Sequence, residues 1–224
     1  MIALGAAQPW LEWAWVERNT DDIRAALGEH VQLTVLAVVL GLLLSVPLGI
    51  AAVRWRRLLG PTLLVTGVLY SIPSLAFIVL LGPWTGFLTM RTVLIPLVAY
   101  TLLILTRNVV AGLDGVPADV RDAADGMGYS RLRRLLKVEL PLAVPAVLAG
   151  IRIATVSTVA LVTVGFIAGH GGLGELIEEG LRRGPRGRTP LTVGLVLSVA
   201  LAIGADLLLL GVQRAATPWA RGRR

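Results

Sequence analysis

The sequence predicts an all-α, polytopic membrane protein with five transmembrane helices and short cytoplasmic helices between the third and the fourth. Three observations carry this prediction. The chain of 224 residues has a mean hydropathy of +0.77 and only 16% charged residues, whereas soluble domains carry about 25%. Five apolar stretches reach the roughly 20 residues that a helix needs to cross the hydrocarbon layer. One long charged segment, residues 114–141, separates two of these stretches.

Composition excludes several classes of function. The chain has no cysteine, and its two histidines, His30 and His170, are far apart, so we expect no disulfide, no thiol catalysis and no metal site. A Gly-x-x-x-x-Gly-Lys-Ser/Thr phosphate loop is also missing, so we expect no catalytic residue, no ATP hydrolysis and no cofactor on this chain. The net charge of +7 does not indicate nucleic-acid binding, because the arginines stand at the ends of apolar runs, where they anchor a protein to lipid.

The predicted elements follow in order along the chain. Residues 1–30 form an amphipathic segment on the outer surface. Residues 31–212 form the transmembrane domain, and residues 213–224 form a cytoplasmic tail. The five predicted spans are residues 31–53, 61–81, 92–113, 142–168 and 189–212. Prolines inside the spans predict kinks. They are tolerated there because neighbouring groups in a membrane protein can satisfy the carbonyl that a proline leaves free. The prolines are Pro47, Pro73, Pro96 and Pro145.

The basic residues predict the orientation. With the C-terminus in the cytoplasm, twelve lysine and arginine residues outside the spans face inward and seven face outward, as the positive-inside rule requires. An odd number of spans then places the N-terminus outside. The six tryptophans all lie outside the five apolar stretches, as in an interfacial belt. We therefore expect a multi-pass protein of the cell membrane, N-terminus out and C-terminus in.

The charged segment 114–141 predicts a helix-turn-helix on the inner face of the membrane. Pro117 and the acids after it begin a first helix, and Gly126 and Gly128 break it with a sharp turn. Ser130 caps a second helix, and Pro141 ends that helix before the fourth span. We expect the apolar side of the second helix to hold Leu132, Leu135, Leu136 and Val138.

The spacing inside this segment resembles a known family. Asp122-Ala-Ala is followed by three residues, Gly128, nine residues and Val138-x-Leu-Pro. The membrane subunits, or permeases, of bacterial ATP-binding-cassette (ABC) importers carry an EAA motif: Glu-Ala-Ala, three residues, Gly, nine residues and Ile-x-Leu-Pro. In that family the short helices dock in a groove of the cytoplasmic ATPase subunit and transmit its closure. The resemblance implies that the coupling residues are Asp122, Ala123, Ala124, Gly128, Leu140 and Pro141.

Further motifs resemble the osmoprotectant permeases among these importers, and the likeness runs from about residue 20 to 218. It implies uptake of glycine betaine, choline, carnitine or proline betaine by alternating access. The chain departs from that family at His170, which usually is a small residue, and in an arginine-rich outer loop. The motifs that carry the likeness are His30-Val-Gln-Leu-Thr, Tyr70-Ser-Ile-Pro-Ser-Leu, Arg107-Asn, Ala149-Gly-Ile-Arg and Gly171-Gly-Leu-Gly-Glu-Leu-Ile.

The resemblance also implies the partners. Two permease subunits, identical or paralogous, form the pathway; separate ATPase subunits hold ATP and Mg; and an extracytoplasmic binding protein delivers the solute. Three alternatives stay open. A permease for another solute, such as methionine, would share the spans and the motif. An ATP-independent transporter would need no coupling motif and often shows paired repeats. An intramembrane enzyme would need a catalytic set, but Asp206 is the only acid in the spans.

Polar side chains at membrane depth need a reason, because each charge there costs on the order of 2.5–3.5 kcal/mol. Arg107 and Asn108 lie in the third predicted span, Arg152 in the fourth and Asp206 in the fifth. The three charges reach similar depth. We therefore expect Asp206 to face the bundle and to pair with either Arg152 or Arg107.

A glycine-rich stretch follows the fourth span and predicts a flexible outer turn. Residues 175–181 after it either re-enter the membrane surface or form an outer loop helix. The sequence shows no acid at the depth of the histidine in this turn, so we do not predict a proton relay there. The outer-turn residues are His170, Gly171, Gly172 and Gly174.

Overall fold

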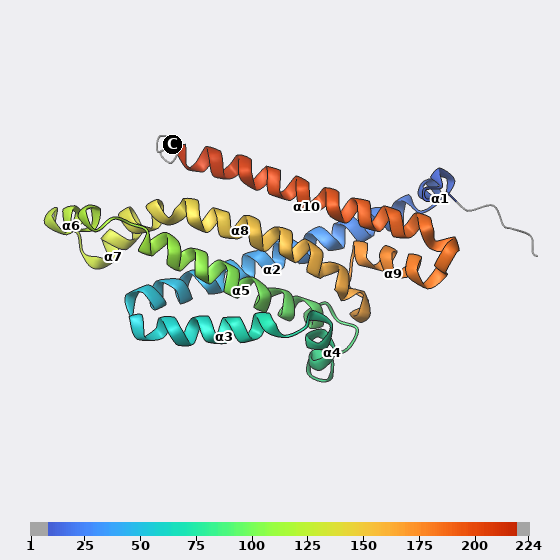
Figure 1. The fold of residues 1–224 in the computed structure, drawn as a ribbon, viewed down its shortest axis with the longest axis horizontal. Coiled ribbons are helices and arrows are strands. Elements are labelled where there is room, and N and C mark those ends of the chain that lie inside the picture. The colour runs from blue at the N-terminus through green and yellow to red at the C-terminus, as the bar shows by residue number, and fades with distance from the viewer. Residues whose placement is uncertain (1–8, 219–224) are drawn as a thin grey trace, which may run out of the picture.

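The computed structural model describes residues 9–218, which form a long bundle of helices (Figure 1). All regular structure within this range is helical. Four helical stretches are long and apolar enough to cross a membrane, and a bent pair of helices makes a fifth span if it is counted as one. The predicted all-α membrane fold is confirmed. The four stretches are Thr20–Arg54, Met90–Asp114, Arg131–Ala168 and Leu173–Ala216, and the bent pair is Arg56–Ser71 with Ser74–Thr85.

The first span is longer than the sequence predicts. After the short helix α1 (Trp13–Arg18), helix α2 runs without a break from Thr20 to Arg54. Residues 20–30 therefore continue the helix of the first span, while residues 1–8 lie outside the described range. The extension packs against the rest of the bundle: His30 has no exposed surface, and Ile23, Ala26 and Leu27 lie against a buried cluster that includes Leu173.

The second predicted span, residues 61–81, is broken in the middle. Helix α3 (Leu59–Ser71) and helix α4 (Ser74–Thr85) meet at an angle of 95°. Pro73 explains the break, because a proline disfavours helical geometry at the residue before it, and Ile72 is extended with φ −68° and ψ 126°. The hydroxyl of Tyr100 donates a hydrogen bond of 2.7 Å to the carbonyl of Ile72, which satisfies a backbone group that the bend leaves free.

Helix α5 (Met90–Asp114) is the centre of the bundle and packs against α2 on one side and α8 (Leu140–Val162) on the other. Glycines bring these helices close together. A Cβ at Gly49 of α2 would lie 2.5 Å from the side chain of Val109, and one at Gly150 of α8 would lie 2.5 Å from Asn108. Small residues at helix contacts are the usual way to gain packing energy in lipid, where water does not drive helices together.

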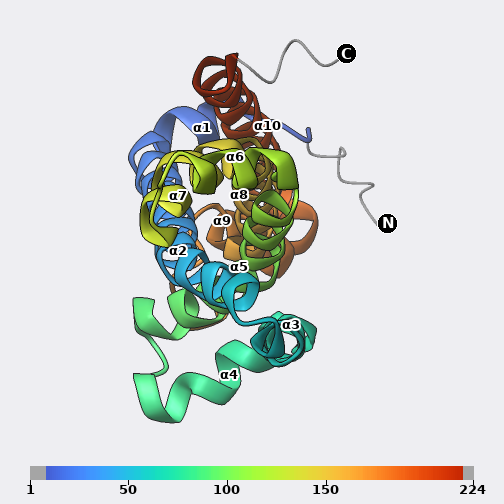
Figure 2. The same ribbon diagram turned by 90° about the vertical axis from the view of Figure 1, so that its left-hand side faces the viewer.

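The two ends of the bundle differ (Figures 1 and 2). One end carries helices α6 (Ala118–Gly126) and α7 (Arg131–Arg134). The opposite end carries α1, α4 and α9 (Leu173–Arg183), which folds back against the start of α10 (Arg188–Ala216). Short 3₁₀ segments connect the remaining helices at Arg56–Leu58, Thr163–Ala168 and Gly184–Gly187.

Candidate functional site

The charged segment forms an elbow, α6 and α7, that projects from one end of the bundle (Figure 1). Pro117 is the N-cap of α6 and Asp119 lies in its first turn, so the predicted helix start is confirmed. Proline has no N–H to lose at this position, and an acid there faces the positive end of the helix dipole.

Gly128 ends α6 with a defined backbone motif. The N–H of Gly128 donates to the carbonyl of Asp125 at 2.9 Å, and the N–H of Tyr129 donates to that of Ala124 at 3.1 Å. These two bonds are the pair that defines a Schellman motif, which needs a left-handed residue after the helix. Gly128 has φ +77°, and only glycine adopts that conformation without strain. The glycine of the motif is thus required by the backbone.

The second helix of the elbow begins as predicted but does not end as predicted. Ser130 accepts a hydrogen bond of 3.4 Å from the N–H of Arg133, as an N-cap does. The chain then continues through a π-helical turn, Leu135–Glu139, directly into α8, with Pro141 in the first turn of that helix. The expected break at Pro141 is therefore wrong. A π turn is the common way for a helix to absorb a local mismatch, and a proline lacks the donor that an unbroken helix would need.

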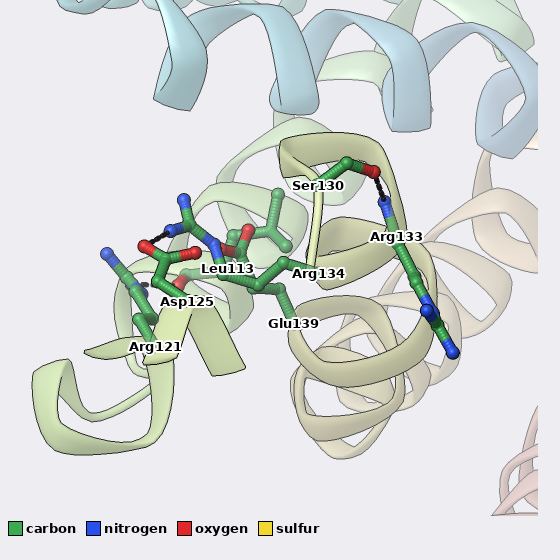
Figure 3. Close-up of polar contacts among 7 residues, drawn as sticks. All are labelled: Leu113, Arg121, Asp125, Ser130, Arg133, Arg134 and Glu139. Carbon is green, nitrogen blue, oxygen red and sulfur yellow. Dashed lines mark hydrogen bonds and ion pairs between the residues drawn. The ribbon is translucent and has the colours of Figure 1, made fainter. Parts of the chain in front are cut away.

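Two arginines fix the elbow to the bundle (Figure 3). Arg134 of α7 forms ion pairs with Asp125 of α6 and, at 2.8 Å, with Glu139 of the π turn. Arg121 of α6 donates a 2.7 Å hydrogen bond to the carbonyl of Leu113 in the last turn of α5. The two helices of the elbow are thus tied to each other, to the π turn before α8 and to α5.

The motif residues divide into a buried and an exposed set. Ala124 is only 1% exposed and faces the protein, whereas Asp122 and Ala123 are exposed. Leu140 and Pro141 are partly buried at the start of α8, where Leu140 packs on a cluster that includes Leu113.

The four residues predicted on the apolar side of the second helix are not all buried. Leu135 packs against the bundle, and Val138 is partly buried. Leu132 and Leu136, however, are 65% and 55% exposed, as is Met127 at 67%. The wider π turn changes the angular spacing of the side chains, so a 3.6-residue period does not describe them. The exposed surface of the elbow therefore includes Asp122, Ala123 and three large apolar side chains.

The intramembrane charges are not all brought together. Arg152 of α8 pairs with Asp206 of α10 through two hydrogen bonds of 2.9 and 2.8 Å, so of the two predicted alternatives the structure contains this one. Gln213 extends the contact, since its side chain accepts from Arg152 at 3.4 Å and donates to the carbonyl of Pro145 at 3.2 Å. Arg107 is exposed and takes no part. Asn108 bonds the carbonyl one turn earlier, at Ile104.

The glycine-rich turn after the fourth span is held by two neighbouring residues of α2. The carboxylate of Glu29 accepts from Nδ1 of His170 at 2.7 Å and from the N–H of Gly172 at 3.2 Å. Nδ1 of His30 accepts from the N–H of Leu173 at 3.3 Å, and its Nε2 donates to the carbonyl of Val159 at 3.0 Å. The first N–H groups of α9, which the helix itself cannot satisfy, are thus capped by another helix.

Two expectations about this turn are wrong. An acid does lie beside His170. It is Glu29 of α2, which is 141 residues earlier in the chain. The glycines also serve close packing more than flexibility. A Cβ at Gly172 would lie 2.7 Å from that of His30, and one at Gly174 would collide with the backbone of Thr163.

Within residues 9–218, no group of three or more His, Cys, Asp or Glu side chains is arranged to hold a metal ion. The polar elements are helix caps and ion pairs between helices. The fold and these contacts define a polytopic membrane protein whose exposed elbow is held to the helix bundle by polar contacts.

Comparison with known proteins gives the family. Residues 37–218 match the family described as the binding-protein-dependent transport system inner membrane component, and the chain belongs to it. It is 31% identical to the choline transport system permease protein OpuBD of Bacillus subtilis, over 90% of this chain and 88% of the relative. It is 35% identical to the osmoprotectant import permease protein OsmW of Salmonella typhimurium, over 89% of this chain and 94% of the relative.

The fold matches that of a chain in a solved ABC transporter. An inward-facing structure of the MetNI methionine ABC transporter contains a chain that superposes with a TM-score of 0.77 and 22% identity, covering 90% of this chain and 99% of that one. A second crystal form gives a TM-score of 0.74 and 23% identity. At this identity the likeness concerns the fold.

Proposed function

We propose that this chain is the permease subunit of an ABC importer for osmoprotectants, and that the elbow is where a separate cytoplasmic ATPase drives it. The observation that carries the proposal is the combination of an exposed Asp122–Ala123 surface with a Schellman turn at Gly128. The surface offers a partner small side chains for close approach. The braces of Arg121 and Arg134 carry a push on α6 into α5 and α8.

The solute class follows from the relatives. Those at 31–35% identity carry names that specify choline, glycine betaine, carnitine or osmoprotectants in general. The methionine transporter resembles this chain at only 22–23% identity. An osmoprotectant such as glycine betaine, choline, carnitine or proline betaine is therefore the solute class that we propose, ahead of an amino acid.

Membership of the family supports a proposal for the rest of the assembly. We propose that ATP and Mg are bound by the ATPase subunits, that a second permease copy or a paralogue completes the pathway, and that an extracytoplasmic binding protein delivers the solute. The orientation with the N-terminus outside and the elbow inside agrees with the excess of basic residues at the elbow end.

One pair of substitutions tests the coupling role. Ala123→Arg places a long charged side chain on the exposed motif surface and should abolish co-purification of the ATPase subunit and ATP-driven uptake. Ala118→Arg is the matched control, because residue 118 is also exposed on α6 but lies five positions earlier, on another side of the helix. If both variants keep the ATPase and take up solute normally, the elbow is not the coupling site.

The solute class has its own test. A competition assay on the associated binding protein should rank glycine betaine and choline above methionine. A preference for methionine would overturn the solute class and leave the coupling role intact.

A further inference from the structure

A cavity of about 520 Å³ lies at the elbow end of the bundle, between the end of α2, the end of α5 and the second helix of the elbow. Figure 2 looks onto this end. The wall of the cavity has an apolar part and a basic part. One part is apolar and includes Ile50, Val53 and Leu113, in the last turns of α2 and α5. The other part holds five arginine side chains, Arg54, Arg56, Arg121, Arg131 and Arg134.

The negative groups near the cavity are already neutralised. Glu139, the only acid in its lining, pairs with Arg134. Arg56 forms two hydrogen bonds, of 2.9 and 2.7 Å, with the carboxylate of Asp114. The carbonyl of Leu113 at the negative end of α5 accepts from Arg121. These contacts leave positive charge in excess at the wall.

Three of the five arginines have unused binding capacity. The Nε atom of Arg121 is buried and has no hydrogen-bond partner among residues 9–218, which is costly for a charged group unless a ligand supplies an acceptor. Arg54 and Arg131 form no ion pair with the described residues. The guanidinium group is suited to phosphate, because its planar set of donors matches two phosphate oxygens at once.

The position of the cavity favours the phosphate group of a lipid over a soluble phosphate. Two apolar helices end at its rim, so it lies at the depth where hydrocarbon gives way to water. Trp55, which lines it and is 54% exposed, is the residue type enriched at that boundary. An apolar wall beside a basic one fits a molecule with a hydrocarbon chain and an anionic head. Basic pockets between membrane helices on the cytoplasmic side are suited to such headgroups.

We propose that this cavity is a binding site for the phosphate headgroup of an anionic phospholipid. The arginines hold the phosphate, and Ile50, Val53 and Leu132 contact the first part of an acyl chain. Because Arg121 and Arg134 also brace the elbow, the bound lipid would stiffen the same joint. The proposal does not depend on the identity of the transported solute.

Native mass spectrometry of the delipidated full-length chain in detergent tests this site, with phosphatidylglycerol titrated as the probe and phosphatidylcholine as the zwitterionic reference. We expect the parent chain to bind phosphatidylglycerol more tightly than phosphatidylcholine. The affinity for phosphatidylglycerol should fall about fivefold in each of the single variants Arg131→Gln and Arg121→Gln. Arg133→Gln is the matched control: it removes the same charge from the same four-residue helix, but its side chain lies over the ring of Tyr129, away from the cavity. It should bind phosphatidylglycerol as the parent chain does.

Three results would overturn the proposal. Equal losses in Arg131→Gln and Arg133→Gln would mean that only the general charge of the elbow matters. Displacement of phosphatidylglycerol by low millimolar inorganic phosphate would identify a site for a soluble anion. Unchanged lipid binding together with loss of the ATPase subunit in Arg131→Gln would identify a protein contact. Arg131 is exposed and forms no ion pair with the described residues, so this variant should fold, and its thermal unfolding midpoint in the same detergent verifies that.

Discussion

Arg152 and Asp206 face each other across α8 and α10 through two parallel hydrogen bonds of 2.9 and 2.8 Å. This geometry, in which a guanidinium fork meets both oxygens of a carboxylate, is the most directional form of ion pair. The buried residues of α10 all lie in its first turns, between Thr189 and Gly194. The pair and Gln213 beside it therefore fix the position of α10 relative to α8 near the elbow end.

Removing one partner of this pair should loosen α10. Asp206→Ala leaves the guanidinium of Arg152 without its carboxylate, so we expect a lower thermal unfolding midpoint in detergent. The exchange Arg152→Asp with Asp206→Arg keeps both charges and should recover part of the loss. If the exchange and the single substitution unfold at the same temperature, the pair does not position α10.

The Schellman glycine gives a comparison between two neighbouring positions. A Cβ added at Gly126 or at Gly128 would meet no other atom within 4 Å, but only Gly128 has a positive φ. Gly128→Ala should therefore destabilise the elbow by about 1–2 kcal/mol through backbone strain alone and reduce ATP-driven uptake. Gly126→Ala, at the last position of α6, should be neutral or slightly stabilising. Uptake assays and unfolding midpoints of both variants measure the difference; equal behaviour would contradict the assigned turn.

The glycines at the two ends of α9 allow the cost of backbone strain to be measured apart from the cost of overpacking. Gly172 and Gly184 have nearly equal positive φ values, +53° and +57°, but only Gly172 lies against another side chain, that of His30. Both alanine variants carry the same backbone strain. Gly172→Ala should lose about 1–3 kcal/mol more, the usual cost of overpacking. Unfolding in denaturant compares the two, and a Gly184→Ala variant that is at least as unstable as Gly172→Ala would refute the close packing.

His30 should be replaceable only by a residue that both donates and accepts. His30→Leu leaves the N–H of Leu173 and the carbonyl of Val159 without their partner, and each unsatisfied buried group costs about 1–3 kcal/mol. His30→Gln carries an acceptor oxygen and a donor nitrogen and should restore part of the stability. The measurement is hydrogen exchange at the start of α9, where His30→Leu should lose protection; protection unchanged in both variants would show that the histidine does not cap this helix.

Local chemistry accounts for the parts of the structure that the sequence predicts well. Long apolar stretches dictate the spans, and Pro117 and Ser130 mark helix starts because their effects act within one turn. The bend at Pro73 is a different case. A proline in a membrane helix can give a small kink or a sharp break, and here the bend is 95°. The hydrogen bond that satisfies the Ile72 carbonyl at this bend comes from Tyr100 on another helix, a contact that the local sequence does not reveal.

The contacts that sequence alone does not reveal join residues far apart in the chain. The acid beside His170 is Glu29 of α2. A comparison of depth along separate spans does not reveal this contact, because the glycine-rich turn folds back onto α2. The residues that brace the elbow, Arg121 and Arg134, look like ordinary solvated charges in the sequence. The spacing of nine residues between Asp125 and Arg134 brings them together only once the turn at Gly128 is formed.

The continuous helix from Arg131 to Ala168 has a mechanical consequence. Its 38 residues span roughly 57 Å, so one helical path joins the elbow to the glycine-rich turn at the opposite end of the bundle. A rigid rod of this length carries a tilt of one end to the other. The π turn just before Pro141 and the proline at 145 interrupt the regular α-helical hydrogen bonding, so we expect this rod to bend there first.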